Sequence, residues 1–149
     1  MLLQKPDVKR SLIESASLLV DFLKRERELS MSNSKTAEVI QQFNDAFQRH
    51  DPAHLTELVA QDCVIENTQP APNGAREIGR EACIARWTEI ATTPGTRFDL
   101  EDVLVAGEHA IIRWRYWWGE GESNSVRGVN LMRVQHGQIV EAMGYVKGA

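Results

Sequence analysis

The sequence predicts an α+β fold in which helices pack on one face of an antiparallel sheet. In the first 60 residues, apolar side chains recur at three- and four-residue steps, a spacing typical of amphipathic helices. From residue 98 onward, segments rich in β-branched and aromatic residues alternate with turn signals, which predicts an antiparallel meander. The chain has 149 residues, of which 42% are apolar and 26% charged, and this suits one globular domain. Helices that are segregated from the strands in this way define the α+β class.

The composition excludes several classes of protein and partner. The apolar content is too high for a disordered chain, and two cysteines are too few for a disulfide scaffold. No apolar run approaches the roughly 20 residues that a membrane-spanning helix needs. The net charge of −4 gives no overall basic surface for nucleic-acid phosphates. We therefore expect neither a nucleic acid nor a membrane as the partner.

Two features indicate a cytoplasmic protein. Lys9, Arg10 and Glu14 interrupt the apolar stretch that a secretory signal would require. Cys63 and Cys83 stand apart from each other and lack the spacing of a zinc site or a redox motif. We therefore expect two buried free thiols in a reducing compartment.

The N-terminal segment predicts a helix of its own. Val8, Leu12, Leu19 and Leu23 follow helical spacing over residues 8–29, and the polar run 30–34 predicts a break after them. We therefore divide the chain into an N-terminal helical extension and linker, 1–34, and a domain, 35–149. Met31 lies at the break and is a second candidate translation start. The helix either packs on its own domain or contacts a second copy or a partner, and the sequence leaves both open.

The sequence of the domain predicts three helices and five strands. A helix over 36–47 ends before Pro52, because a residue that precedes proline avoids the α conformation. The remaining predicted elements are a short helix at 55–59, a strand at 63–67, a helix at 79–90, and strands at 98–105, 109–118, 126–135 and 138–146. A hairpin loop at 119–124 and the His136-Gly137 turn join the last three strands.

Four motifs, in this order and spacing, carry a family resemblance. They are IQQFNDAF at 40–47, LVAQDCV at 58–64, GREA at 79–82 and GVNLMRV at 128–134. Over residues 36–147 the chain resembles the SnoaL-like branch of the nuclear transport factor 2-like superfamily. The resemblance implies a cone-shaped roll, in which a curved antiparallel sheet wraps three helices around a deep apolar pocket. It also implies a homodimer through the outer sheet face and no metal or organic cofactor.

Strand alternation predicts which side chains face that pocket. The inward set on the last strand is Val140, Ala142, Gly144 and Val146. The predicted substrate-binding residues are Phe43, Ile65, Trp87, Ile112, Trp114, Trp118 and Met132. The predicted polar, candidate catalytic residues are Tyr116, Asn67 and Asn130. Large aromatic walls with a few polar groups are typical of small-molecule sites.

The family's known chemistries are largely missing from these positions. By the resemblance, Asn67 stands at the carboxylate base of ketosteroid isomerases, Asn130 at their acid and Phe43 at their tyrosine. An amide cannot act as a base near neutral pH, so a classical ketosteroid isomerase is not expected. Of the epoxide-hydrolase constellation only Asn67 matches. A divergent epoxide hydrolase would need a carboxylate from Asp99, Glu101 or Asp102.

We therefore expect a protein that binds a small, largely apolar, oxygen-bearing molecule through Asn67, Asn130 and Tyr116. As an enzyme it would be a cofactor-independent isomerase, cyclase or dehydratase with Tyr116 as the proton donor. The alternatives are a non-catalytic dimeric interaction protein and the divergent epoxide hydrolase. The predicted homodimer face is convex and combines charged with apolar side chains. Its members are Glu141, Arg113, Arg115, Arg127, Arg133, Trp117, Leu131, Met143 and Tyr145.

Overall fold

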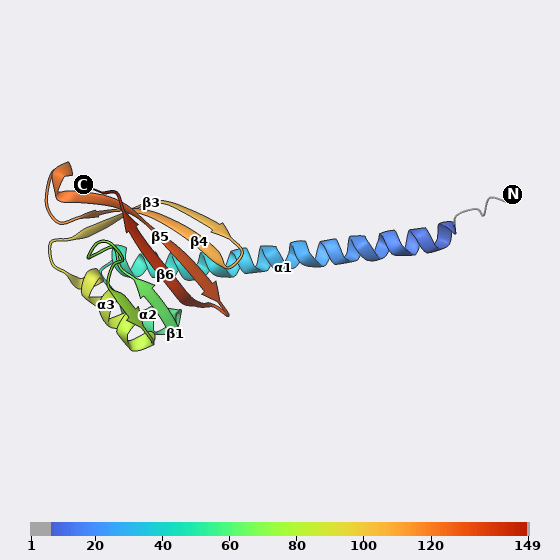
Figure 1. Cartoon of the computed structure of the whole chain (residues 1–149), viewed down its shortest axis with the longest axis horizontal. Helices are drawn as coiled ribbons and strands as arrows, with labels where there is room; N and C mark the ends of the chain where they lie inside the picture. The colour runs from blue at the N-terminus through green and yellow to red at the C-terminus, as the bar shows by residue number, and fades with distance from the viewer. Residues whose placement is uncertain (1–6, 149) are drawn as a thin grey trace.

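The N-terminal part of the chain forms one long helix. The computed structural model describes residues 7–148, and α1 runs without interruption over Val8–Gln48 (Figure 1). The side chain of Asp7 caps it by accepting a hydrogen bond from the backbone N–H of Arg10 at 3.2 Å. The predicted break at 30–34 is therefore wrong. The division of the chain between residues 34 and 35 stays a prediction.

The polar residues of the expected break are satisfied inside the helix. The Ser34 hydroxyl donates to the carbonyl of Ser30 at 3.0 Å, one turn back along α1. Asn33 Oδ1 accepts from the backbone N–H of Gly107 at 2.6 Å, and the Thr36 hydroxyl donates to the carbonyl of the same glycine at 2.7 Å. The side chains thus bond to the helix and to a neighbouring turn, so their polarity does not end the helix.

The two halves of α1 have different surroundings. In the C-terminal half, Val39, Ile40, Phe43 and Phe47 are buried against the rest of the fold. Residues 7–31 are exposed along their whole length, and this half of the helix projects away from the other elements (Figure 1). None of the helices within residues 7–148 combines the length and apolar content needed to cross a membrane.

Two shorter helices complete the helical layer. α2 covers Leu55–Leu58 and α3 covers Arg80–Thr92. α3 buries Cys83, Trp87 and Ala91, which follow one another at four-residue steps on one face.

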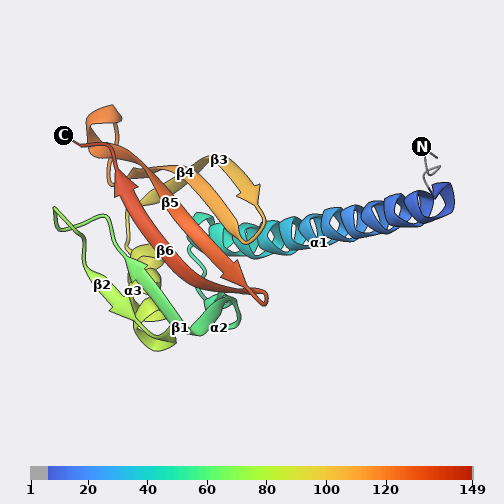
Figure 2. The same ribbon diagram turned by 45° about the vertical axis from the view of Figure 1, so that its right-hand side comes forward.

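Six strands form one curved, unclosed sheet that wraps around the C-terminal half of α1 and α3 (Figure 2). The strands are β1 Val59–Glu66, β2 Arg76–Ile78, β3 Arg97–Ala106, β4 His109–Trp117, β5 Ser125–Gln135 and β6 Gln138–Val146. Their order is β2-β1-β6-β5-β4-β3, and a short 3-10 turn, η1 Glu122–Asn124, lies between β4 and β5. The fold is α+β as predicted. The sheet departs from the expectation at the β1–β6 pair, which is parallel, and at β2, which was not predicted.

A β-bulge near the start of β6 changes which residues face inward. Val134 pairs with Ile139 but Arg133 pairs with Glu141, so Val140 is the extra residue. As a result Ile139 is fully buried. The prediction that Val140 faces inward is therefore wrong, while Ala142, two residues past the bulge, is buried as expected.

Candidate functional site

A cavity of about 620 Å³ lies between the concave sheet face and the helices α1 and α3. Its volume falls in the range of small-molecule sites. It is bordered by α1, α3, strands β1, β3, β4, β5 and β6, and the loop after β1. Its lining residues include Phe43, Asn44, Phe47, Gln48, Ile65, Asn67, Gln69, Trp87, Phe98, Ile112, Trp114, Tyr116, Asn130 and Gly144.

One wall of the cavity is a connected group of aromatic rings. Phe98 on β3 is its centre, with ring centroids 5.5 Å from Phe47, 5.6 Å from Trp114 and 4.7 Å from Tyr116. Phe43 lies 4.8 Å from Phe47 on the same helix face. The Phe98 contacts with Phe47 and Trp114 are edge-to-face, an arrangement that aromatic pairs favour. The rings contact one another and still border the open volume.

Asn130 on β5 has a fixed orientation in this wall. Its Oδ1 accepts a hydrogen bond from the indole Nε1 of Trp114 at 3.2 Å. Because an indole N–H can only donate, this contact identifies the oxygen of the amide and directs the two N–H bonds of Nδ2 elsewhere. Within residues 7–148 that nitrogen donates to no other group. Asn130 therefore offers donors to the cavity.

Asn67, at the end of β1, is held by the neighbouring loop. Its backbone N–H and its Nδ2 both donate to the carbonyl of Ala75, at 2.9 and 3.2 Å. The Oδ1 of Asn67 is left as an acceptor at the cavity. The Tyr116 hydroxyl makes no hydrogen bond to a residue in the described range, so it can donate or accept there.

The charged residues at the cavity border are Glu66, Arg86 and Glu89, and each of them makes an ion pair. Arg86 lies 3.0 Å from Glu77 and 3.0 Å from Glu89, both ion pairs. Glu66 lies 3.6 Å from Arg76. These groups form a charged margin around an aromatic interior.

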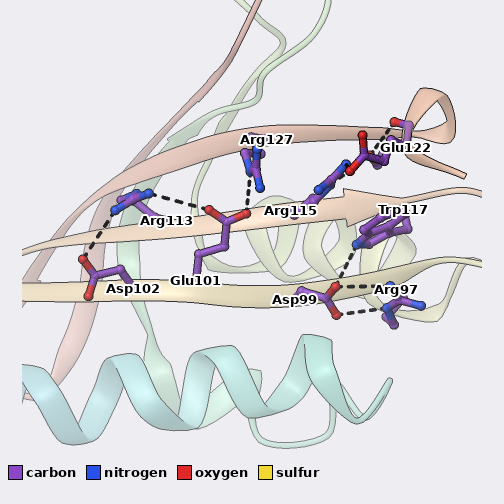
Figure 3. Close-up of polar contacts among 10 residues, drawn as sticks. Arg97, Asp99, Glu101, Asp102, Arg113, Arg115, Trp117, Glu122 and Arg127 are labelled. Atoms are coloured by element: carbon purple, nitrogen blue, oxygen red, sulfur yellow. Dashed lines mark hydrogen bonds and ion pairs between the residues drawn. The ribbon is translucent and has the colours of Figure 1, made fainter.

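The carboxylates considered for epoxide hydrolysis lie on the other side of the sheet (Figure 3). Glu101 accepts from Arg127 at 2.7 Å and lies 3.7 Å from Arg113, which is also 3.7 Å from Asp102. Neither Glu101 nor Asp102 borders the cavity. They cannot supply a base beside Asn67.

Asp99 is the third of these carboxylates, and it too is absent from the cavity wall. It accepts hydrogen bonds from Arg97 at 2.9 Å and from the indole of Trp117 at 2.8 Å (Figure 3). The Arg97 hydrogen bond, reinforced by that of Trp117, lowers the pKa of Asp99 below its ordinary value despite partial desolvation. The Arg115 guanidinium stacks on the Trp117 ring at 4.2 Å, so the cluster combines charge pairing with cation–π contact. The condition that a divergent epoxide hydrolase would need, one of these three carboxylates beside Asn67, is therefore not met.

The structure brings together most of the residues selected from the sequence. Phe43, Ile65, Trp87, Ile112, Trp114, Asn67, Asn130 and Tyr116 all border the cavity. Met132 does not border it, and lies fully buried in the core between its strand partners Ala110 and Ala142. Trp118 does not either, because β4 ends at Trp117 and Trp118 begins the following loop, where it is 49% exposed.

Several cavity residues were missed. Asn44 and Gln48 lie one helical turn apart on α1, beside Phe43 and Phe47. Their spacing was visible in the sequence, but polar residues on a helix are normally assigned to solvent. Gln69 lies in the loop after β1, whose path no periodicity indicates.

Cys63 and Cys83 are fully buried free thiols beside each other. The Cys83 Sγ donates to the carbonyl of Cys63 at 3.4 Å. Burial raises the pKa of both thiols, which suppresses the nucleophilic thiolate. Within residues 7–148, no group of three His, Cys, Asp or Glu side chains is placed to hold a metal ion.

Comparison with known proteins agrees with this architecture. A model of the SnoaL-like domain matches residues 40–142. An NTF2-like protein of unknown function from Mesorhizobium loti is 67% identical, with a TM-score of 0.75 over 78% of this chain and 93% of that chain. No protein of curated function matches the chain.

More distant solved structures share the fold. A proposed ketosteroid isomerase from Kribbella flavida has a TM-score of 0.65 at 18% identity, over 78% of this chain and 81% of that chain. A proposed polyketide cyclase from Sinorhizobium meliloti has a TM-score of 0.59 at 21% identity, over 72% and 93% of the two chains. The domain match and the Mesorhizobium relative together show that this chain belongs to the SnoaL-like domain family.

Proposed function

We propose that the protein binds a small, largely apolar molecule that carries a carbonyl oxygen, and that it does so in the aromatic cavity. The supporting observation is the Trp114–Asn130 hydrogen bond. It occupies Oδ1 of Asn130 and leaves the Nδ2 donors for a ligand. Such a donor in an apolar surrounding gives orientation and about 1 kcal/mol of net binding energy.

The other polar groups extend this recognition. Asn67 supplies an acceptor for a ligand hydroxyl, because its own Nδ2 is bonded to Ala75. The Tyr116 hydroxyl can donate a proton or a hydrogen bond. If the bound molecule is transformed, Asn130 polarises its carbonyl and Tyr116 supplies the proton, as in a cofactor-independent isomerase, cyclase or dehydratase. We place this activity in the cytoplasm, in agreement with the two unpaired thiols.

A thermal-shift screen tests the binding proposal. The panel contains ketosteroids, aromatic polyketide mimics, terpene epoxides and fatty acids, each with a hydrocarbon analogue of the same skeleton. A ligand at 100 times its Kd stabilises the fold by about 2.7 kcal/mol. For a chain of this length, that corresponds to a shift of roughly 5–10 °C.

Two variants separate the donor of Asn130 from its structural role. Asn130→Asp keeps an oxygen for Trp114 but replaces the donors by a carboxylate. The apolar surroundings raise the pKa of that new carboxyl group, so carbonyl binding weakens at pH 8 and recovers as the pH falls and the acid becomes protonated. Asn130→Leu has neither group and is expected to bind carbonyl ligands weakly at every pH. The affinity for the hydrocarbon analogues is expected to be the same in Asn130→Asp as in the unsubstituted protein.

The screen also has outcomes that would refute the proposal. Unchanged carbonyl affinity in Asn130→Asp at pH 8 would refute the role of the amide donors. No shift from any ligand class would favour the alternative of a non-catalytic interaction protein.

We also propose that the convex sheet face forms a homodimer. Leu104, Ile111, Leu131 and Met143 are successive cross-strand partners, so they form one apolar row across β3, β4, β5 and β6. Leu104 is 59% exposed and Leu131 is 43% exposed. Pairs such as Arg133–Glu141, at 3.8 Å, flank the row and supply the polar rim typical of protein interfaces.

The dimer proposal is tested by light scattering at tens of micromolar. Leu131→Asp places a charge in the row and is expected to lower the mass of the assembly. Ile78→Asp, on β2 outside the row, is the matched control because Ile78 is also exposed. Equal masses for the two variants would contradict this interface.

A further inference from the structure

The projecting half of α1 carries more apolar surface than a solvated helix needs. Its exposed large apolar residues are Val8, Leu12, Ile13, Leu18, Leu19, Val20, Phe22, Leu23, Leu29 and Met31. In proteins most helix stability comes from packing of an amphipathic face, and a solitary helix in water is marginal. This half of α1 has such a face and, within the described chain, leaves it exposed, with only Leu29 near Gly107 of the β3–β4 turn.

The apolar face follows a seven-residue repeat that begins in the core. Thr36, Ile40, Phe43 and Phe47 are the buried positions of α1 at alternating four- and three-residue steps. Continued toward the N-terminus, the same steps reach Asn33, Leu29, Glu26, Phe22, Leu19, Ser15, Leu12 and Val8. Residues at this spacing form the seam of a coiled coil. The seam that packs on the domain therefore runs on beyond it, unpartnered.

The polar seam residues distinguish the two ways in which copies can pair. In a parallel pair Glu26 would face Glu26 of the second copy, which places two like charges in the seam. In an antiparallel pair centred between residues 20 and 21, Leu19 faces Phe22 and Leu12 faces Leu29 of the second copy. The same alignment places Ser15 against Glu26, so the two polar positions meet and can hydrogen-bond. Only the outermost layer, Val8 against Asn33, is mixed, and it lies at the domain edge.

The positions beside the seam agree with the antiparallel alignment. Ala16 lies beside Leu23 of the second copy on one side. Leu18 lies beside Arg25 on the other side, where the aliphatic stem of the arginine can cover the leucine. The alignment brings no two like charges together along the pair.

Charge and area point to a second copy as the occupant. Residues 7–31 contain five Lys or Arg and five Asp or Glu, so the segment lacks the cationic face of a helix that binds anionic membranes. Seven of the exposed apolar residues lie on or beside the seam, and at roughly 100 Å² each they supply about 700 Å² per copy. That is within the range of roughly 600–1,000 Å² that one partner contributes to a standard protein interface.

We propose that residues 8–33 of two copies form an antiparallel helix pair, with the two domains at its opposite ends. The pair is distinct from the convex sheet face and from the cavity. It buries the apolar face of α1 that the domain itself leaves in solvent.

Disulfide crosslinking in the full-length protein tests both the pairing and its direction. In the antiparallel pair Ser15 meets Glu26, whereas the two Ser15 residues lie about 16 Å apart along the axis, too far for a disulfide. Under mild oxidation, a mixture of Ser15→Cys and Glu26→Cys is therefore expected to give a covalent dimer, and each variant alone is not. The natural cysteines do not interfere, because both are fully buried, and the unsubstituted protein verifies this.

A second measurement uses the mass of the assembly in a Leu131→Asp background, which removes any contribution of the convex face. In that background Leu19→Asp is expected to halve the mass at tens of micromolar. Val20→Asp is the matched control, since Val20 is the adjacent exposed residue but lies off the seam. Crosslinking of Ser15→Cys with itself would overturn the antiparallel arrangement. A monomeric Leu131→Asp protein, or equal masses for Leu19→Asp and Val20→Asp, would overturn the helix pair.

Discussion

Trp114 lies opposite Gly128 on the neighbouring strand, and the end of its indole ring occupies the space that a Cβ at position 128 would take. The absence of a side chain at 128 thus leaves room for the ring over β5. In that position its Nε1 reaches Asn130. Gly128 therefore permits the position of the Trp114 ring, and Trp114 in turn orients the Asn130 amide that faces the cavity.

Gly128→Ala is expected to displace Trp114 and to weaken the Asn130 contact. The added methyl group meets the ring and the carbonyl of Tyr145, neither of which is a flexible chain end. Overpacking of this kind costs about 1–3 kcal/mol of unfolding free energy. Urea unfolding and the near-ultraviolet circular dichroism of the tryptophans measure the two effects. Gly148→Ala, beyond the end of β6, is the control for the loss of a glycine, because its backbone is outside the left-handed region and no atom lies within 4 Å of the added methyl group.

Asp99 is expected to make stability depend on pH on the acid side. Its pKa in the folded protein lies below its ordinary value, so it stabilises the fold above the unfolded pKa of about 3.9 and loses that contribution as the pH falls through the folded pKa. Asp99→Asn should therefore be less stable than the unsubstituted protein at pH 7, with the difference shrinking toward pH 2–3. Urea unfolding across this range is the measurement.

The control for Asp99 is Asp102→Asn. Asp102 pairs with Arg113 at 3.7 Å and is 47% exposed, and exposed pairs contribute little to stability. A pH-independent difference for Asp99→Asn would contradict the assigned role of Arg97 and Trp117.

Thr36 is expected to be the principal polar contact between α1 and the β3–β4 turn. It is 2% exposed, and its hydroxyl donates to Gly107 at 2.7 Å. Thr36→Val keeps the shape but leaves that carbonyl without this donor, at a cost of about 1–3 kcal/mol in urea unfolding. Ser34→Ala removes an exposed hydroxyl bonded only within the helix, and a change within about 0.5 kcal/mol is expected there.

Cys63 and Cys83 are expected to resist thiol reagents in the folded protein. Burial removes access and raises the pKa of each thiol, so little thiolate is present near neutral pH. Reaction with a chromogenic disulfide should proceed only as fast as the protein opens, and should reach two thiols per chain in denaturant. Rapid labelling in buffer would contradict the burial of the pair.

The sequence predicted the β-strands well because alternation and turn chemistry act locally. His136-Gly137 joins β5 and β6 as expected, and β6 has the predicted bounds, Gln138–Val146. The prediction that Val140 faces inward failed because the bulge adds one residue to β6, and alternation carries no signal for a bulge. β2, with three residues between a proline-rich loop and Gly79, is too short to show any period.

The continuity of α1 could not be predicted locally. Serine and asparagine favour breaks when only their intrinsic preference is considered. Here Asn33 is bonded to Gly107, which lies 74 positions away in sequence, so a tertiary contact decides the local conformation. The cavity residues were likewise predicted only in part. Strand parity indicated Trp114 and Asn130. The loop signal that begins at Gly119 put the end of β4 one residue too late, and for this reason Trp118 was assigned to the wrong place.

Because α1 is continuous, a tilt at one end of the helix displaces the other end. Phe43 borders the cavity, and Val8 lies 35 residues further along the same rod, about 52 Å at 1.5 Å per residue. A tilt of about 5° at the cavity moves the far end by about 5 Å by this geometry. Repacking around Phe43 that is too slight to resolve inside the domain would therefore be amplified into a displacement measurable between spectroscopic labels.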